Sequence, residues 1–214
     1  LNSAAPLIKE GKHLLIEKPL ADNLSSANLL KQMANKQQVK IAVGFVERFN
    51  PAVQAIKNSI KDERIIKCEA KRVSPYPSRI NDVGVKLDLA IHDVDLVRFL
   101  TGQEIIKCED INFTALTGAE HEDNTTLFVK MSEGAAATIN SSWSYPFRER
   151  YISVLTTESY HLADMFNCIA YKYSPCQGTG YRKERLWSYK QDALTLQLKQ
   201  FVDYIKNDNP GPLS

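Results

Sequence analysis

The tripeptide Glu17-Lys18-Pro19 follows a short apolar run, and its lysine could do chemistry there. The run, residues 13–16, predicts a short buried strand. In an open α/β sheet, ligands bind outside the carboxyl ends of the strands, so a lysine at this point can direct its ammonium group into a crevice. Pro19 fixes the backbone as the chain leaves the sheet. The alternative is a surface Glu-Lys pair beside a proline that ends the strand.

A second group of residues, Asp88, His92 and Asp95, has the spacing i, i+4, i+7. If residues 84–102 form a helix, these three side chains share one face. An aspartate one turn from a histidine can hold the imidazole in the tautomer whose other nitrogen faces a substrate, as in a general base. One alternative is a helix N-terminus with acidic residues near its dipole and a surface histidine. A metal site is the other, although one histidine and carboxylates in one helix are an incomplete ligand set.

Three motifs follow one another along the chain. The segments 11–19 (GKHLLIEKP) and 43–51 (VGFVERFNP) precede Asp88-x-x-x-His92 and Asp95. In these motifs, their order and their spacing, the chain resembles the Gfo/Idh/MocA family of nicotinamide-dependent sugar and cyclitol oxidoreductases. The similarity runs over nearly the whole chain.

The resemblance implies functions for individual residues. The catalytic group would consist of Lys18, Asp88 and His92. In it, His92 removes the proton of a substrate hydroxyl, Asp88 orients His92, and Lys18 polarises the oxygen. The cofactor, NAD or NADP, would be contacted by Glu17, Lys18, Pro19 and Arg48. The partner in the reaction would be a small sugar-type substrate.

The segment 71–82 is a candidate for substrate binding. Two prolines in it predict a shaped loop. Arg72 and Arg79 could hold a phosphate or a carboxylate through paired hydrogen bonds, and Tyr76 could stack on a ring or a base. We assign these three residues and Asp95 to substrate binding; the alternative is a surface loop whose arginines are solvated. The loop and the segment after it look most like the branch of the family that oxidises sugar nucleotides at the sugar C3 position.

The chain departs from the family at its start. Such proteins begin with a glycine-rich turn, where backbone N–H groups approach a pyrophosphate, and carry an acidic residue on the second strand. No G-x-G-x-x-G is present here. We therefore expect a fragment that lacks the N-terminal part of the dinucleotide-binding domain and is inactive as it stands, and the choice between NAD and NADP stays open. Two functions follow. One is an NAD(P)-dependent dehydrogenase of a sugar, cyclitol or sugar-nucleotide hydroxyl, and the other is a truncated, non-catalytic remnant that serves as an oligomerisation or interaction module.

The predicted elements divide the chain into two parts. Residues 1–46 alternate helix and strand, as in the C-terminal part of a Rossmann domain. Residues 47–214 predict an α+β domain for substrate binding and oligomerisation, with a mostly antiparallel, open-faced sheet and helices on one face. Helices are expected at residues 25–37, 51–62, 84–102 and 192–206, the last two over the sheet. Strands are expected at residues 64–73, 105–117, 125–132, 135–143, 151–157, 161–173 and 185–189.

Two hairpins and one free face of the sheet are also predicted. Gly134 and residues 157–159 mark the hairpins. The free face would be apolar and join a second copy of the chain, as in the family, giving a homo-oligomer. Its expected residues are Phe113, Ala115, Leu127, Val129, Ala137, Ile139, Ser141 and Trp143. Alternation alone does not assign the face, so the alternative is that these residues face the helices.

The composition excludes several other classes of function. The chain is 43% hydrophobic and 24% charged, which suits a globular core, and its formal net charge of +2 gives no case for nucleic acid or an anionic membrane. No apolar run reaches the roughly 20 residues that cross a bilayer. The four cysteines are too widely spaced for a zinc motif. A hydrolase also fits poorly, since no G-x-S-x-G elbow is present. We expect a cytoplasmic protein.

Overall fold

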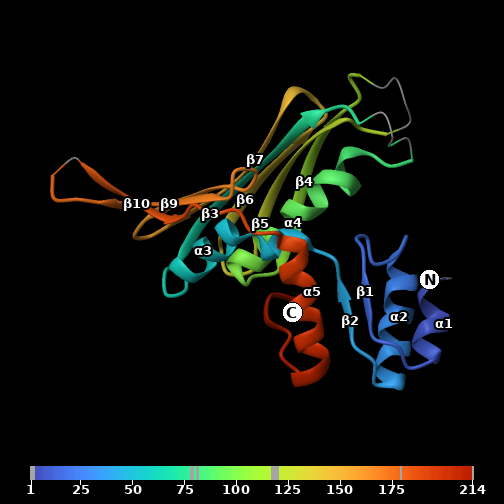
Figure 1. Cartoon of the computed structure of the whole chain (residues 1–214). Helices are drawn as coiled ribbons and strands as arrows, with labels where there is room; N and C mark the ends of the chain where they lie inside the picture. Colours follow the sequence, from blue (N-terminus) through green and yellow to red (C-terminus); the bar gives the residue numbers. More distant parts are fainter. Residues whose placement is uncertain (1–2, 78–79, 81, 117–120, 179, 214) are drawn as a thin grey trace. The chain divides into compact units, whose positions relative to one another are not determined.

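The computed structural model describes residues 3–77, 80, 82–116, 121–178 and 180–213 (Figure 1). Backbone contacts divide the chain into two compact units. The first unit consists of Leu1–Phe49 together with Asp192–Ser214, and the second of Asn50–Gln191. The C-terminal helix therefore groups with the N-terminal residues, whereas the sequence placed it over the sheet of the second domain.

The first unit contains a two-stranded parallel sheet flanked by helices. Strands β1 (Leu14–Ile16) and β2 (Ile41–Val43) pair in parallel, with α2 (Leu24–Gln37) between them in the chain. Helix α2 begins where the Asn23 side chain accepts a hydrogen bond from the Ser26 amide at 2.8 Å, which satisfies one orphan donor of its first turn. A small core of Ile8, Leu30, Ala34 and Val39 joins α2 to α1 (Ala4–Lys9). This βαβ arrangement confirms the Rossmann-type reading of the N-terminal residues.

The C-terminal helix α5 (Ala193–Asn207) packs near two short 3₁₀ helices of the same unit, η1 (Val46–Phe49) and η3 (Gly211–Leu213). Asp192 caps the start of α5 by accepting from the amides of Leu194 and Thr195. The ammonium group of Lys40 lies 2.7 Å from the Asp208 carboxylate at the other end, and it also donates to the carbonyl of Tyr204. A cation at a helix C-terminus is favourable, so Lys40 stabilises α5 beside the sheet of the first unit.

The second unit is built on one eight-stranded sheet. Its order is β10-β9-β8-β7-β3-β6-β5-β4, and every neighbouring pair is antiparallel except β3 with β6. The strands are β3 (Ile65–Pro75), β4 (Ile105–Phe113), β5 (Asn124–Met131), β6 (Ala136–Ser142), β7 (Ser144–Thr156), β8 (Tyr160–Asp164), β9 (Ile169–Pro175) and β10 (Tyr181–Trp187). This confirms the predicted class, a Rossmann-type piece followed by a mostly antiparallel sheet. Both predicted hairpins are present, at β5–β6 with Gly134 at φ +91° and at β7–β8.

One predicted strand is wrong. Residues 161–173 form two strands, β8 and β9, because the chain turns back between Asp164 and Ile169. The Asp164 side chain accepts from the backbone and side-chain amides of Asn167, which closes this turn. Cys168 then adopts a positive φ of 59°. The apolar residues on both sides hid the reversal from the hydrophobic pattern.

Two helices cover one face of the sheet, α3 (Pro51–Ser59) and α4 (Ile91–Thr101) (Figure 1). Helix α3 begins with Pro51 after an Asn50 cap, and α4 follows a π-helical turn, η2 (Lys86–Ala90). Most residues assigned to the free apolar face are in fact buried. Leu127, Val129, Ala137 and Ile139 belong to the core that packs under these helices, and Ser141 and Trp143 are buried as well. The alternative reading of the alternation is therefore the correct one for them, whereas Phe113 and Ala115 are exposed.

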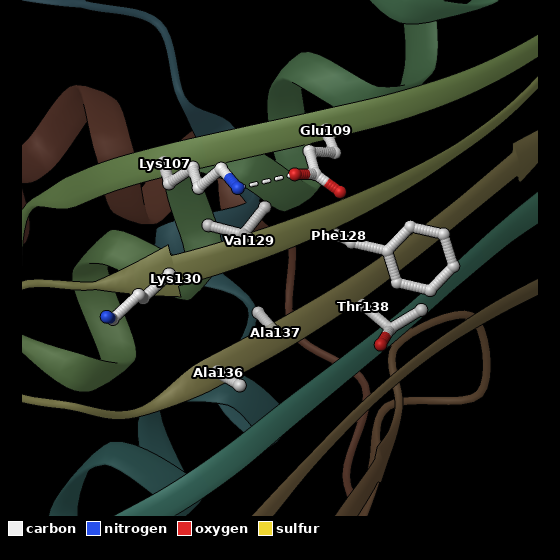
Figure 2. Close-up of a pocket in the computed structure, with 8 residues that line it drawn as sticks. All are labelled: Lys107, Glu109, Phe128, Val129, Lys130, Ala136, Ala137 and Thr138. Atoms are coloured by element: carbon white, nitrogen blue, oxygen red, sulfur yellow. Dashed lines mark ion pairs between the residues drawn. The ribbon is translucent and has the colours of Figure 1, made fainter.

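The opposite face of the sheet is open. A hollow of about 270 Å³ lies on strands β4, β5 and β6, and Figure 2 shows the side chains that line it. It is lined by Lys107, Glu109, Phe128, Val129, Lys130, Ala136, Ala137 and Thr138. Lys107 and Glu109 form an ion pair of 2.6 Å at its edge, and Phe128 is the aromatic residue among them. The exposed face is thus more polar than the sequence predicted.

In the part of the chain described here, no helix is long and apolar enough to cross a membrane.

Candidate functional site

The carboxyl ends of β1 and β2 hold the first group of candidate residues. Glu17 follows β1 directly, and Gly44 follows β2 and donates its amide to the carbonyl of Ile16 at 2.6 Å. The Glu17 side chain lies against Gly44, since a Cβ added at Gly44 would come 3.1 Å from Oε2 of Glu17. Glycine therefore lets the two strand ends approach closely, at the edge where an open α/β sheet binds ligands.

Lys18, Pro19 and Arg48 belong to the same unit. Lys18 is half-buried, and its peptide bond to the exposed Pro19 is cis. Arg48 lies in η1, where its guanidinium donates to the carbonyl of Pro212 at 3.1 Å and lies 5.7 Å from the ring centroid of Phe45. Arg48 thus ties the end of β2 to the C-terminal residues. A direct contact with a cofactor stays a prediction for all three.

The second group starts at the π-helical turn before α4. The amide of Val85 donates to the Glu122 carbonyl, and that of Lys86 donates to Oε1 of Glu122 at 3.1 Å. A Cβ at Gly84 would collide with the Glu122 carboxylate. Glycine at this position therefore allows an acidic group to reach the positive end of the turn that carries Asp88. The prediction of a helix here is confirmed, although its first turn is wider than an α-helix.

Asp88 lines a cavity of about 210 Å³ in the second unit. The cavity lies along the ends of β3 and β7 and the η2 turn. Its described lining residues are Arg72, Val73, Ser74, Pro75, Tyr76, Pro77, Ile80, Asp88, Leu89, Trp143, Arg148 and Arg150. The structure thus brings Arg72, Tyr76 and Asp88, three residues selected from the sequence, to one cavity. Whether that cavity binds substrate stays a prediction.

Arg72 is engaged by an acidic neighbour. Its Nη2 lies 2.8 Å from Oδ1 of Asp93, and its Nε lies 3.0 Å from Oδ2. The side chains are only 3% and 0% exposed, so the pair is buried. Its geometry joins β3 to α4, and we interpret Arg72 chiefly as a positioning residue for that helix.

Tyr76 stands at the mouth of the cavity. Its ring meets that of Trp143 edge to face, with centroids 5.6 Å apart, and its hydroxyl donates to the carbonyl of Ile80 at 3.1 Å. These contacts hold an exposed tyrosine in place. An aromatic ring fixed in this way can stack on the ring of a ligand.

His92 and Asp95 are not among the described lining residues of that cavity. His92, the second residue of α4, is half-buried one turn after Asp88, while Asp95 is 4% exposed on the same helix. Arg79 lies outside the described residues. Among those that are described, no three His, Cys, Asp or Glu side chains are grouped so that they could hold a metal ion.

Sequence reasoning missed three residues of the cavity: Trp143, Arg148 and Arg150. Trp143 had been assigned to an open face, yet it is buried, and its indole N–H has no acceptor among the described residues. The two arginines belong to β7, where they are spaced i, i+2. In a strand, alternate residues lie on the same side. This spacing was the one feature of the sequence that could have placed the two arginines together.

Two family models match the chain. Residues 2–45 match an oxidoreductase family with an NAD-binding Rossmann fold, and residues 64–160 match the Gfo/Idh/MocA C-terminal domain. The second match includes Asp88, His92 and all of the described cavity lining.

Individual relatives agree with these matches. UDP-N-acetylglucosamine 3-dehydrogenase of Acidithiobacillus ferrooxidans is 29% identical over 95% of this chain and 66% of its own length. Myo-inositol 2-dehydrogenase of Thermotoga maritima is 25% identical over 96% of this chain and 66% of its own length. The chain therefore spans slightly less than two thirds of these curated relatives. A crystal structure of the Acidithiobacillus enzyme superimposes with a TM-score of 0.92 at 28% identity, covering 100% of this chain and 69% of that one.

Proposed function

Because the chain belongs to the Gfo/Idh/MocA family of oxidoreductases, we propose that it serves NAD(P)-dependent hydride transfer at a hydroxyl group of a sugar, a cyclitol or a sugar nucleotide. The observation that carries this proposal is the position of Asp88. Its carboxylate lines a cavity that also holds an aromatic ring and arginines, one turn before His92. The relatives named above are dehydrogenases of a sugar nucleotide and of a cyclitol.

The strand ends of the first unit fit a nicotinamide cofactor. Glu17 and Gly44 approach each other closely at the carboxyl ends of two parallel strands, the edge where an open α/β sheet binds ligands. We assign Glu17, Lys18 and Pro19 to this edge, with Arg48 supporting it through its bond to Pro212. A bound nicotinamide cofactor would supply the hydride acceptor.

The protein side of the reaction is a proton transfer. His92 would accept the proton of the substrate hydroxyl as the carbinol carbon loses its hydride, and Asp88 would hold the imidazole in the required tautomer. Lys18 would polarise the substrate oxygen and stabilise the negative charge that develops on it. The buried pair of Arg72 and Asp93 would fix the helix that carries His92.

Substrate contacts are assigned to the loop after β3. Tyr76 would stack on a ring of the substrate, and Arg79 would contact its polar groups. Asp95 is buried on α4, and Arg72 is bonded to Asp93, so both would shape the site through α4.

We also propose a homo-oligomer that forms through the open face of the eight-stranded sheet. The hollow in Figure 2 combines an exposed phenylalanine, Phe128, with small residues such as Ala136 and Thr138. The Lys107–Glu109 ion pair at its edge supplies both charges, which a second copy related by a two-fold axis could complement.

The experiment that tests the proposed function is a direct assay of alcohol oxidation. Purified protein carrying these residues is incubated with NAD⁺ or NADP⁺ and with UDP-N-acetylglucosamine, N-acetylglucosamine or myo-inositol, and formation of the reduced nicotinamide is followed by absorbance. We expect turnover with at least one of these alcohols and its loss in the His92→Ala variant. Equal rates in the variant, or no oxidation of any sugar or cyclitol, would contradict the proposal.

A further inference from the structure

The residue Glu122, shortly before β5, packs against the turn that carries Asp88. It is half-buried and contacts the beginning of η2 with both its backbone and its side chain. Its carbonyl accepts from the amide of Val85 at 2.9 Å, and its Oε1 accepts from the amide of Lys86 at 3.1 Å. Amides in the first turn of a helix have no acceptor within the helix, so Glu122 supplies two bonds that the turn itself cannot make.

The buried Gly84 leaves the space that the Glu122 carboxylate occupies. A methyl group added to Gly84 would overlap this carboxylate. The φ angle of Gly84 is not positive, so an alanine could adopt the same backbone conformation. The missing side chain of Gly84 is therefore what allows the acidic group to approach the turn.

The backbone beside Glu122 is held in place by the next residue. The Asp123 carboxylate is fully buried and accepts from the amides of Ala115 at 3.0 Å and Leu116 at 2.6 Å. The carbonyl of Asp123 accepts from the amide of Trp143 at 2.9 Å. The Glu122 carboxylate thus projects from a segment that is bonded on both sides, as a positioning group must be.

Lys86 has a second acidic neighbour, Asp110 of β4. Its ammonium group forms an ion pair with the Asp110 carboxylate, and the two side chains are 35% and 42% exposed. Solvent screens such an exposed pair, so it contributes little. The bond from the Lys86 amide to Glu122, beside the buried Gly84 and Val85, is the one that we expect to hold the backbone of the turn.

The positions of Asp88 and His92 both depend on that turn. Asp88 is the third residue of η2, and its amide donates to the carbonyl of Gly84 at 3.1 Å. The turn continues directly into α4, which carries His92. A shift of the turn would therefore move both side chains, and a misplacement of about 1 Å can lower the rate of an enzyme on the order of 10²-fold.

We infer that Glu122 is a positioning residue for the proton transfer, because its carboxylate, seated against Gly84, holds the turn from which Asp88 and His92 project. This inference rests on the proposed function and adds a residue to it. Glu122 is not among the described lining residues of the cavity. It would therefore act through Asp88 and His92 and not through contact with the substrate.

Two substitutions that remove this support in different ways provide the test. Glu122→Ala deletes the carboxylate, and Gly84→Ala displaces it, since the added methyl meets the flexible end of the Glu122 side chain. Each should lower kcat for alcohol oxidation about 10–100-fold, with little change in the KM for the alcohol. In the double variant the methyl meets no carboxylate, so this variant should be no slower than Glu122→Ala alone.

Two further variants serve as controls. Glu122→Gln keeps an oxygen that can accept from the Lys86 amide, so it should retain most of the rate. Asp110→Ala removes the other acidic neighbour of Lys86 and should leave kcat unchanged. The inference is overturned if Asp110→Ala slows the reaction as much as Glu122→Ala does.

Nuclear magnetic resonance gives a readout that does not require activity. The chain has four histidines, so the Cε1–H signal of His92 can be identified by its loss in His92→Ala. In Glu122→Ala and Gly84→Ala this signal should shift, and the Lys86 amide should exchange with solvent at least about tenfold faster. Glu122→Gln and Asp110→Ala should resemble the unchanged protein. Circular dichroism shows whether each variant is folded; if both alanine variants unfold, the role of Glu122 is structural and the inference is wrong.

These outcomes are separable from the test of the proposed function. A shifted His92 signal without oxidation of any alcohol would retain the positioning by Glu122 and reject the dehydrogenase. Oxidation that is lost in His92→Ala but keeps its rate in Glu122→Ala and Gly84→Ala would retain the dehydrogenase and overturn the inference.

Discussion

Arg72 and Asp93 form a buried ion pair between strand β3 and helix α4, with Nη2 of the arginine 2.8 Å from Oδ1 of the aspartate. Asp93 directly follows His92, so the pair fixes the backbone of the candidate base. Two other arginines that line the cavity, Arg148 and Arg150, belong to β7, the strand that pairs with β3. The residues around His92 would therefore set the position of its imidazole relative to a substrate.

The first prediction concerns the stability of that pair. Arg72→Ala should lower the free energy of unfolding by about 3–5 kcal/mol, because it leaves the Asp93 carboxylate buried without its partner. Urea denaturation followed by circular dichroism measures the change. The matched control is Arg98→Ala, which breaks the exposed pair of Arg98 with Glu104 and should cost much less, because solvent screens an exposed ion pair. Equal losses in the two variants would mean that the pair is not buried in solution.

The sequence predicted the elements of the second unit better than it predicted their faces. Alternation located β5 and β6 through residues such as Leu127 and Ile139, and the structure has both strands. The alternation of apolar and polar residues is the same whichever face of the sheet the helices cover, because it shows only that alternate side chains share a face and not which face that is. Burial shows that Leu127 and Ile139 face the helices.

The candidate site was predictable only where a motif existed. Asp88 came from a motif and Tyr76 from a loop marked by two prolines, and both line the cavity. Arg148 and Arg150 stand in no motif, and they reach the cavity because β7 pairs with β3, a contact between residues far apart in sequence. Arg72 and Asp93 are also separated in the sequence, by 21 positions, so a sequence alone could not distinguish a ligand-binding arginine from a structural one.

The second prediction is a pH dependence of stability that arises from Glu63. Burial raises the pKa of Glu63, but hydrogen bonds from Lys172, Ser159 and Thr156 outweigh it and lower that pKa from 4.5 to about 2. A carboxylate with a lowered pKa in the folded state stabilises the fold above the unfolded value. Its contribution, at most about 3 kcal/mol, should be complete above pH 4.5 and disappear as the pH falls toward 2.

Urea denaturation between pH 2 and pH 7 tests this contribution. Glu63→Gln should be less stable than the unchanged protein at pH 7, and the two free energies should converge in acid. The control is Glu133→Gln in the exposed turn between β5 and β6, which should follow the unchanged protein throughout. Parallel curves for Glu63→Gln and the unchanged protein would refute the prediction.

The third prediction concerns association through the open sheet face. Phe128→Glu should raise the dissociation constant of the oligomer by at least about tenfold, because a carboxylate would be buried without a partner at the centre of the interface. Sedimentation velocity over a concentration series measures it. Phe166→Glu, at an exposed aromatic residue of the β8–β9 turn, is the matched control. Trp143 is unsuitable for this purpose, since it is buried in the core and its replacement would report on folding. If the unchanged protein is a monomer at all concentrations, the proposed interface is wrong.

The last prediction assigns the proton transfer. His92→Ala should lower kcat by about 10²–10⁴, the usual contribution of general acid–base catalysis, and should flatten the acid limb of the pH–rate profile. Asp88→Asn should lower kcat less, because an asparagine can still hold the imidazole although it no longer stabilises its charged form. Lys18→Ala should lower kcat with little change in cofactor affinity, whereas Lys36→Ala, on the exposed surface of α2, should change neither. Steady-state kinetics at several pH values, with cofactor affinity from fluorescence titration, separates these effects. If His92→Ala keeps both its rate and its acid limb, His92 is not the base and the base must be sought elsewhere.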